Sequence, residues 1–301
     1  MPATFSRRGF LALAAAPAIA APQAEFSSAV SVVSLLVTVR DKSGKFVNDL
    51  AQEDFEVVDD NRPQTLTYFS RQYDLPLTLG LLVDTSGSQA DVLGEELEAS
   101  AKFFQQVLRE DMDQAFLTSF DGRAYLLQNV TTVRAKLEGA LGNLYRGLQT
   151  RRYVNGTVLY DAIVDTSELI MKKYQGRKAL VLLTDGEDTA SLTNLDRAVE
   201  ACQRTDTVVY SIGLGTGLAR GGGVLDTLSQ KTGGRFFEVS RKRTVETIYQ
   251  TIEEELRSQY NLGYAPPPAA GKNRNGYHKV RVTVSRTGMT ARTREGYYSG
   301  G

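Results

Sequence analysis

Residues 77–88 read LTLGLLVDTSGS and contain the clearest indication of the fold. It is an apolar run that ends at Asp84 and passes directly into small polar residues. Similar runs are KALVLLTDG at 178–186, which reaches Asp185, and TVVYSIGLG at 207–215. Unbroken apolar strands are typical of a parallel sheet whose two faces are both covered by helices. The sequence therefore predicts an α/β core.

Helical stretches separate these strands. The apolar residues of the first stretch recur at three- and four-residue spacing, on one helical face: Leu93, Leu97, Ala101, Phe104 and Leu108. Further helices are expected near 132–145, 157–174, 194–205, 224–232 and 244–260. The Asp-Gly pair at 121–122, between two apolar runs, indicates a hairpin and one antiparallel edge strand. We therefore expect a doubly wound, Rossmann-like, mostly parallel sheet, which binds ligands at the carboxyl ends of its strands.

The two flanks of this core have the sequence pattern of short strands joined by tight turns. We expect residues 28–74 to form an N-terminal β flank, residues 75–260 the core domain, and residues 261–301 a C-terminal β flank that pairs with 28–74. From Asp41 to Asp74 there are eight acidic and four basic residues, whereas from Ala265 to the end there are seven basic and one acidic. Opposite charges favour their association, and each flank alone has too few strands for a good core.

The first residues predict export. Residues 1–20 contain paired Arg7 and Arg8, an apolar run, and the small-x-small triplet Ala18-Ile19-Ala20, with cleavage expected at about 20–24. This pattern looks like a twin-arginine signal peptide. The apolar run is shorter than the roughly 20 residues of a membrane span. We expect a mature chain without a membrane span, in the periplasm or outside the cell.

Composition narrows the function classes. The chain has 35 basic and 35 acidic residues, so no overall field indicates a nucleic-acid partner. Cys202 is the single cysteine, expected to be buried and inert, and the one histidine, His278, is expected at the surface of the C-terminal flank. A Ser-His-Asp hydrolase is therefore disfavoured. The glycines after the strand at 207–215 do not meet G-x-G-x-x-G, and we expect 218–223 to be a mobile loop.

Oxygen ligands follow the apolar strands at positions that should share one edge of the sheet. They are Asp84, Ser86 and Ser88 after the first strand, Thr157 before a helix, and Asp185 after KALVLLT. Taken singly, Asp84 could end a strand and Thr157 could cap its helix. Together they predict a site for a small, hard divalent cation, which prefers oxygen ligands.

This set, D-x-S-x-S with a distant threonine and a later T-D-G, resembles the metal-ion-dependent adhesion site of von Willebrand factor type A domains. The resemblance covers about 77–260, and the flanks resemble those of a bacterial VWFA-related family of acidobacterial type. It implies that Ser86, Ser88 and Thr157 offer hydroxyls to Mg²⁺, or to Mn²⁺ or Ca²⁺. It also implies that Asp84 and Asp185 bind mainly through water.

The implied function is a non-enzymatic, metal-dependent protein-binding or adhesion module. An open position on the cation should accept a carboxylate of a partner protein, and no catalytic residue is assigned. Two alternatives stay open. One is a metal-assisted hydrolase that uses Asp121, Asp188 or Glu187; the other is a structural exported domain whose metal only stabilises the fold.

Overall fold

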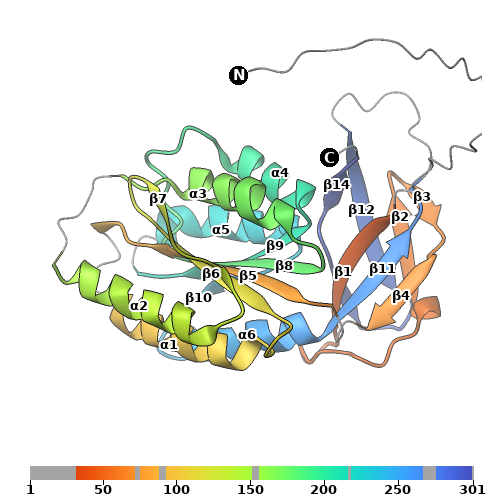
Figure 1. Ribbon diagram of the computed structural model, residues 1–301. Coiled ribbons are helices and arrows are strands. Elements are labelled where there is room, and N and C mark those ends of the chain that lie inside the picture. The colour runs from red at the N-terminus through yellow and green to blue at the C-terminus, as the bar shows by residue number, and fades with distance from the viewer. Residues whose placement is uncertain are drawn as a thin grey trace, which may run out of the picture. The chain divides into compact units, whose positions relative to one another are not determined.

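A six-stranded sheet forms the centre of the computed structural model, which describes residues 32–71, 75–87, 93–150, 156–215, 218–266 and 276–299. Its strand order is β10-β9-β8-β5-β6-β7 (Figure 1). These strands are β5 (Leu77–Asp84), β6 (Gln114–Phe120), β7 (Ala124–Thr131), β8 (Arg177–Thr184), β9 (Thr207–Gly213) and β10 (Phe236–Glu238). All neighbouring pairs are parallel except β6 and β7, which flank the predicted turn at Asp121. The predicted antiparallel edge strand is confirmed.

Helices cover both faces of this sheet. They are α1 (Leu93–Val107), α2 (Arg134–Leu148), α3 (Leu159–Asp165), α4 (Leu195–Arg204), α5 (Leu218–Thr232) and α6 (Val245–Arg257). After α3 the chain continues as a π-helix, Thr166–Ile170, and a 3-10 turn, Met171–Lys173. Helices α1, α2 and α6 lie on one face, and α3, α4 and α5 on the other (Figure 1).

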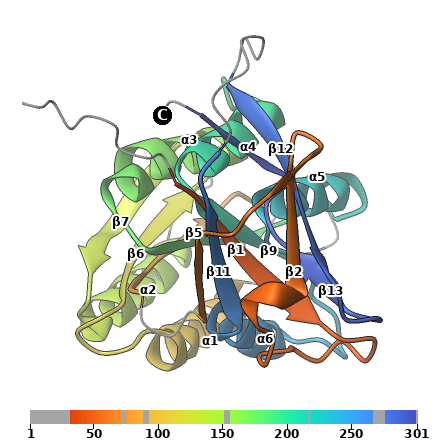
Figure 2. The same ribbon diagram turned by 90° about the vertical axis from the view of Figure 1, so that its right-hand side faces the viewer.

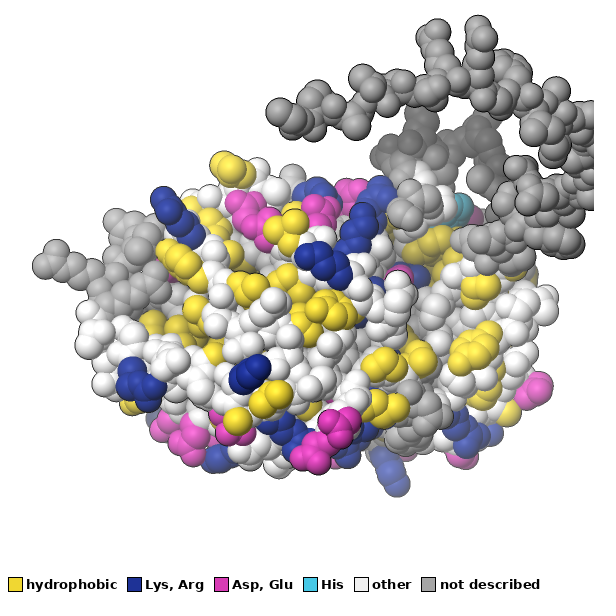
Figure 3. All heavy atoms as spheres, viewed as in Figure 1, with side chains coloured by type: hydrophobic (Ala, Val, Ile, Leu, Met, Phe, Trp, Pro, Cys, Tyr) yellow, Lys and Arg dark blue, Asp and Glu magenta, His cyan; other side chains and the backbone are white. Residues whose placement is uncertain are grey.

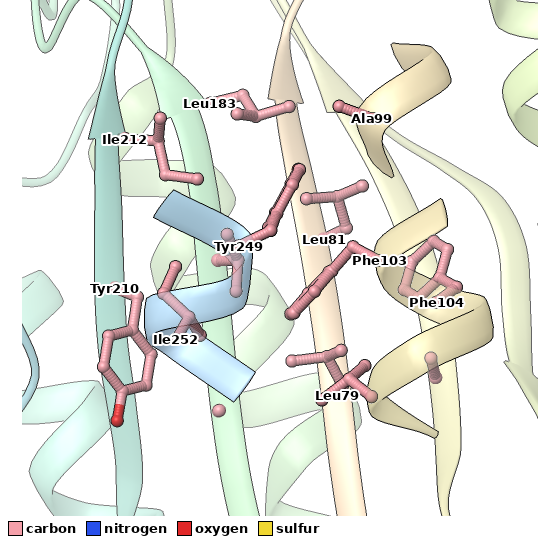
Figure 4. Packing of buried hydrophobic residues seen from close by; sticks show 14 of the residues in the cluster. Leu79, Leu81, Ala99, Phe103, Phe104, Leu183, Tyr210, Ile212, Tyr249 and Ile252 are labelled. Carbon is pink, nitrogen blue, oxygen red and sulfur yellow. The ribbon is translucent and has the colours of Figure 1, made fainter. Parts of the chain in front are cut away.

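The central strands are buried because alternate side chains enter opposite cores. Leu79 and Leu81 of β5 face α1 and α6, whereas Leu82 faces the α3 side. Figure 4 shows the first of these cores, where Phe103 of α1 and Tyr249 of α6 stack with ring centroids 4.2 Å apart. A sheet covered in this way explains the unbroken apolar runs of the sequence. The predicted fold class is confirmed.

Two further four-stranded sheets, here called the flank sheets, combine strands from both ends of the chain. Their orders are β13-β1-β11-β4 and β14-β12-β2-β3. The strands are β1 (Val33–Arg40), β2 (Phe55–Asp59), β3 (Arg62–Gln64), β4 (Tyr68–Arg71), β11 (Gln259–Tyr264), β12 (Tyr277–Val284), β13 (Thr290–Arg292) and β14 (Gly296–Tyr298), with a 3-10 turn at Gln52–Asp54. Figure 2 shows these sheets nearest the viewer, after a 90° turn from the view of Figure 1. All of their pairings are antiparallel.

Apolar and charged contacts hold the flank sheets together. Their shared core includes Leu35 from the N-terminal side and Tyr260 and Val280 from the C-terminal side. Arg286 pairs with Asp54 at 3.0 Å and Asp49 at 3.2 Å, as the opposite charges of the flanks suggest. Over the face seen in Figure 3, acidic and basic side chains are interspersed.

Three further expectations concern the ends and the single cysteine. The expected signal peptide, residues 1–20, and its cleavage point at about 20–24 lie outside the described residues. Among the helices that the structure describes, none is long and apolar enough to cross a membrane. Cys202 is buried as expected, and burial raises the pKa of its thiol to about 12, which keeps the sulfur protonated.

Candidate metal centre

The end of β5 places two of the predicted ligands at the carboxyl edge of the sheet. Asp84, Thr85 and Ser86 are all buried. The Ser86 backbone N–H donates to Asp84 Oδ1 at 3.0 Å, and the Thr85 N–H donates to the carbonyl of Phe120 at 2.8 Å. These bonds turn the chain sharply after the strand and tie it to the end of β6. The backbone therefore fixes the Asp84 carboxylate.

The end of β8 brings Asp185 to the same edge. The parallel register pairs Val83 with Leu183, so the residues that follow them are neighbours. The Thr184 hydroxyl donates to Asp84 Oδ2 at 2.7 Å. One residue later, Asp185 Oδ1 accepts the Glu187 backbone N–H at 3.0 Å. Both carboxylates thus lie at adjacent strand ends, each held by a backbone donor.

Thr157 reaches this edge through the loop before α3. Its carbonyl accepts the N–H groups of Thr189 and Ala190, at 3.0 and 3.1 Å, and the next N–H, of Val158, donates to the carbonyl of Asp121 at 2.8 Å. The N-cap of α3 is Val158, with no side-chain cap bond. Thr157 therefore does not cap its helix, and the alternative that it serves only as an N-cap is wrong. We call residues 84–87, 120–122, 156–158 and 184–189 the rim.

Electrostatics at the rim favour a cation. Burial raises the pKa of Asp84 to about 6, the negative charge of Asp185 adds to the increase, and hydrogen bonds from Thr184 and Ser86 oppose it. Two carboxylates from buried residues repel each other at adjacent strand ends. A divalent cation would offset both charges, and the nearby hydroxyl oxygens suit a hard ion such as Mg²⁺. The residues present therefore fit a metal.

The structure brings four of the five predicted ligands to the rim: Asp84, Ser86, Thr157 and Asp185. Ser88 lies outside the described residues. The carboxylates proposed for hydrolysis differ in their surroundings. Asp188 accepts the Tyr160 N–H at 3.1 Å and the Ser191 hydroxyl at 2.5 Å, which ties its loop to α3.

The stretch 218–223 was expected to be a loop, and this expectation is wrong. It forms the first turns of α5. A Cβ on Gly221 would lie 2.1 Å from the carbonyl oxygen of Asp185, and one on Gly186 would lie 2.7 Å from the carbonyl oxygen of Gly221. The glycines therefore allow a helix to pack directly on the backbone of the rim, and do not mark a flexible segment.

His278 was expected at the surface, and the structure contradicts this as well. The residue is only 9% exposed. Its Nδ1 lies 3.0 Å from Asp60 Oδ2 and 3.7 Å from Asp59 Oδ1. The register that pairs Val280 with Asp59 brings them together. Three residues of metal-ligating type thus meet in the flank sheets. The sequence predicted that the two flanks pair, but it did not predict which strand lies opposite the turn at Asp60.

Comparisons with known proteins agree with this fold. A family model for the von Willebrand factor type A domain matches residues 79–251. Among curated proteins, none matches.

Several solved structures have a similar fold. Proximal thread matrix protein 1 from the mussel byssus, with a zinc-occupied MIDAS motif, is 15% identical with a TM-score of 0.53; the match covers 67% of this chain and 50% of that one. The vWF domain of the type V pili tip protein Mfa5 from Porphyromonas gingivalis is 11% identical with a TM-score of 0.47, over 60% of this chain and 95% of that one. This chain matches about half the length of the mussel protein.

Proposed function

This chain belongs to the von Willebrand factor type A domain family, and on that premise we propose that it is an exported, metal-dependent protein-binding module. Domains of this family are adhesion and protein-interaction modules and are generally not enzymes. The proposal is that a divalent cation at the rim captures an acidic side chain of a partner protein. The observation that carries it is the pairing of Asp84 and Asp185 at adjacent strand ends, beside the hydroxyl-bearing Ser86 and Thr157.

The proposed ligands are Asp84, Ser86, Ser88, Thr157 and Asp185. They would hold Mg²⁺, with Mn²⁺ and Ca²⁺ as substitutes, because all five offer oxygen. The cation supplies a positive charge that a carboxylate can approach. The chain's own part is to hold two carboxylates and several neutral hydroxyls in place. With only two acidic ligands, a divalent ion keeps enough positive character to gain from a third negative group.

The partner would therefore present an aspartate or glutamate. Backbone N–H donors hold the Asp84 and Asp185 carboxylates, so we expect little ordering to be needed when a cation binds. Export is proposed from Arg7 and Arg8 and the apolar run that follows. It would place the module in the periplasm or outside the cell, where a partner on the envelope could be reached.

Titration calorimetry of the full chain with MgCl₂ tests the metal centre. Asp185→Ala should weaken Mg²⁺ binding by roughly 10- to 100-fold, the usual effect of removing a residue that holds a metal ion through its bound water. Circular dichroism in EDTA should be unchanged, since the side chain lies at a strand end. Asp111→Asn is the control, because Asp111 is exposed in the turn before β6, at the end of that strand opposite to the rim. Unchanged affinity in Asp185→Ala would refute the assignment.

Partner capture from an envelope extract of the producing cell, with Mg²⁺ or with EDTA, separates the binding module from its alternatives. Thr157→Ala should weaken capture more than it weakens Mg²⁺ binding. Changing the critical partner acid to its amide should have the same effect. Capture that is equally strong in EDTA would mean that the metal only stabilises the fold.

A further inference from the structure

The structure contains a second cluster of ligand-type side chains, in the flank sheets. Asp59 ends β2, Asp60 begins the turn to β3, and His278 lies on the facing strand β12. Their contacts bridge 218 residues of sequence. We propose that Asp59, Asp60 and His278 form a zinc site that fastens the N-terminal flank to the C-terminal flank, independently of the rim.

The separations of the three ligand atoms suit one ion. His278 Nδ1 lies 3.0 Å from Asp60 Oδ2 and 3.7 Å from Asp59 Oδ1, and all three atoms lie within 4.8 Å of one another. Ligands at about 2.0–2.2 Å from a tetrahedral zinc ion are roughly 3.3–3.6 Å apart. Small side-chain movements would therefore place all three around a zinc ion.

Asp59 provides an independent sign of a missing positive partner. Its side chain is fully buried, and Oδ1 has no hydrogen-bond partner. The other oxygen, Oδ2, accepts the hydroxyls of Tyr264 at 2.9 Å and Tyr297 at 2.8 Å. A buried carboxylate oxygen without a partner is costly, and Asp59 Oδ1 is the oxygen nearest His278 Nδ1. A cation between these two atoms would satisfy it.

The surroundings orient the histidine as a ligand. The Ser299 hydroxyl lies 3.2 Å from both the Gly276 carbonyl oxygen and His278 Nε2. In the tautomer that carries its proton on Nε2, the ring donates to Ser299 and the lone pair of Nδ1 faces the two carboxylates. The ring also stacks on Tyr297, with centroids 4.9 Å apart and planes at 13°. A histidine whose second nitrogen is held in this way is typical of metal sites.

The carboxylates are supported in the same manner. The hydroxyl groups of Tyr264 and Tyr297 hold Asp59 through its Oδ2. Asp60 Oδ1 accepts the Lys279 N–H at 2.9 Å, which leaves Oδ2 toward His278. Both aspartates therefore use one oxygen for the protein and turn the other toward the histidine.

The ligand types select zinc over the cation of the rim. An imidazole with two carboxylates suits Zn²⁺, whereas Mg²⁺ and Ca²⁺ prefer oxygen alone. The Asp60 side chain is 42% exposed, so the cluster has a route to solvent and room for water as a fourth ligand. Because β2 and β12 come from opposite ends of the chain, a bound zinc ion would cross-link the two flanks.

Equilibrium dialysis of the full chain against ZnCl₂ tests this site in an Asp84→Ala/Asp185→Ala variant. This rim-silenced protein lacks the two carboxylates proposed to bind metal at the rim. That protein should bind one zinc ion, and its melting temperature should rise with zinc. Adding His278→Gln or Asp60→Asn should weaken zinc binding by more than about 100-fold, and Tyr297→Phe by roughly 10- to 100-fold. Asn tolerates the positive φ of 45° at position 60, so Asp60→Asn should keep the fold.

The control is Asp111→Asn, which makes the same chemical change at a φ of 59° in an exposed turn. It should leave zinc binding unchanged. The proposal is overturned if the rim-silenced protein binds no zinc at 100-fold molar excess. In that case the cluster is a contact between His278 and the two carboxylates without a metal. It is equally overturned if zinc binds but neither His278→Gln nor Asp60→Asn weakens it. Failure at the rim would change none of these results.

Discussion

Thr184, the last residue of β8, donates its hydroxyl hydrogen to Oδ2 of Asp84, the last residue of β5, over 2.7 Å. Both residues are fully buried. The Gly186 N–H donates to the same hydroxyl oxygen at 3.0 Å, so the hydroxyl hydrogen is left to point at Asp84. A chain of two bonds therefore joins the two strand ends that carry the rim carboxylates.

Thr184→Val should weaken Mg²⁺ binding by roughly 10- to 100-fold, because it removes an outer-shell donor to a metal-site carboxylate. It should also lower the free energy of unfolding by about 1–3 kcal/mol, since a buried oxygen of Asp84 loses its partner. Thr184→Ser keeps the hydroxyl and should bind within a few-fold of the wild type. Calorimetry and urea unfolding would measure both effects. Equal affinities for Val and Ser would show that Thr184 does not position Asp84.

The raised pKa of Asp84 predicts a pH dependence of stability in the metal-free protein. Its ordinary value is 3.8, and burial brings it to about 6 in the folded state. Between these values the unfolded chain loses a proton that the folded protein keeps. The contribution of this group to the free energy of unfolding is therefore greatest below pH 3.8 and falls as the pH rises to about 6. Above pH 6 the loss levels at roughly 3 kcal/mol.

Asp84→Asn is the reference for this measurement, because it removes the titrating group and leaves the other groups in place. In EDTA, the unfolding free energy of the wild type relative to Asp84→Asn should decline across that pH range. Saturating Mg²⁺ should abolish the decline, since the cation stabilises the ionised carboxylate. A flat difference curve in EDTA would mean that Asp84 is not held protonated by its surroundings.

The sequence was most informative where one physical requirement governs many residues. Strands buried on both faces must be apolar throughout, so β5, β8 and β9 were recognisable, and the carboxylates after the first two strands indicated one edge of the sheet. The structure could not be predicted where it depends on long-range pairing. His278 and Asp59 meet only through the register of β12 with β2, which no local pattern encodes. The start of α5 was missed because three glycines disfavour a helix locally, while close packing on Asp185 requires them.

Removal of residues 265–301 tests whether the flanks depend on each other. This truncation keeps β11 but takes β12 and β14 from the sheet that contains β2 and β3. The shared core would lose Val280, Val282 and Tyr297. We expect limited proteolysis to cut within residues 52–66, whereas Mg²⁺ binding at the rim persists. If residues 52–66 stay as resistant as in the full chain, the N-terminal flank is stable without its partner.

Glycines of α5 provide the sharpest test of how the rim is packed. A Cβ at Gly221 would lie 2.1 Å from the Asp185 carbonyl oxygen and 2.5 Å from the Gly186 carbonyl carbon, and both are backbone atoms that cannot rotate away. A Cβ at Gly223, two residues later on the same helix, would meet nothing within 4 Å. The two positions therefore separate packing at the rim from helix propensity.

Gly221→Ala should lower the free energy of unfolding by about 1–3 kcal/mol, the usual cost of overpacking. It should also weaken Mg²⁺ binding, because relief of the clash displaces Asp185. Gly223→Ala should instead stabilise the protein by about 0.5–1 kcal/mol, since alanine favours the helix, and leave Mg²⁺ binding unchanged. Urea unfolding and calorimetry on the two variants measure these opposite signs. If Gly221→Ala is as stable as Gly223→Ala and binds Mg²⁺ equally well, α5 does not support the rim through this contact.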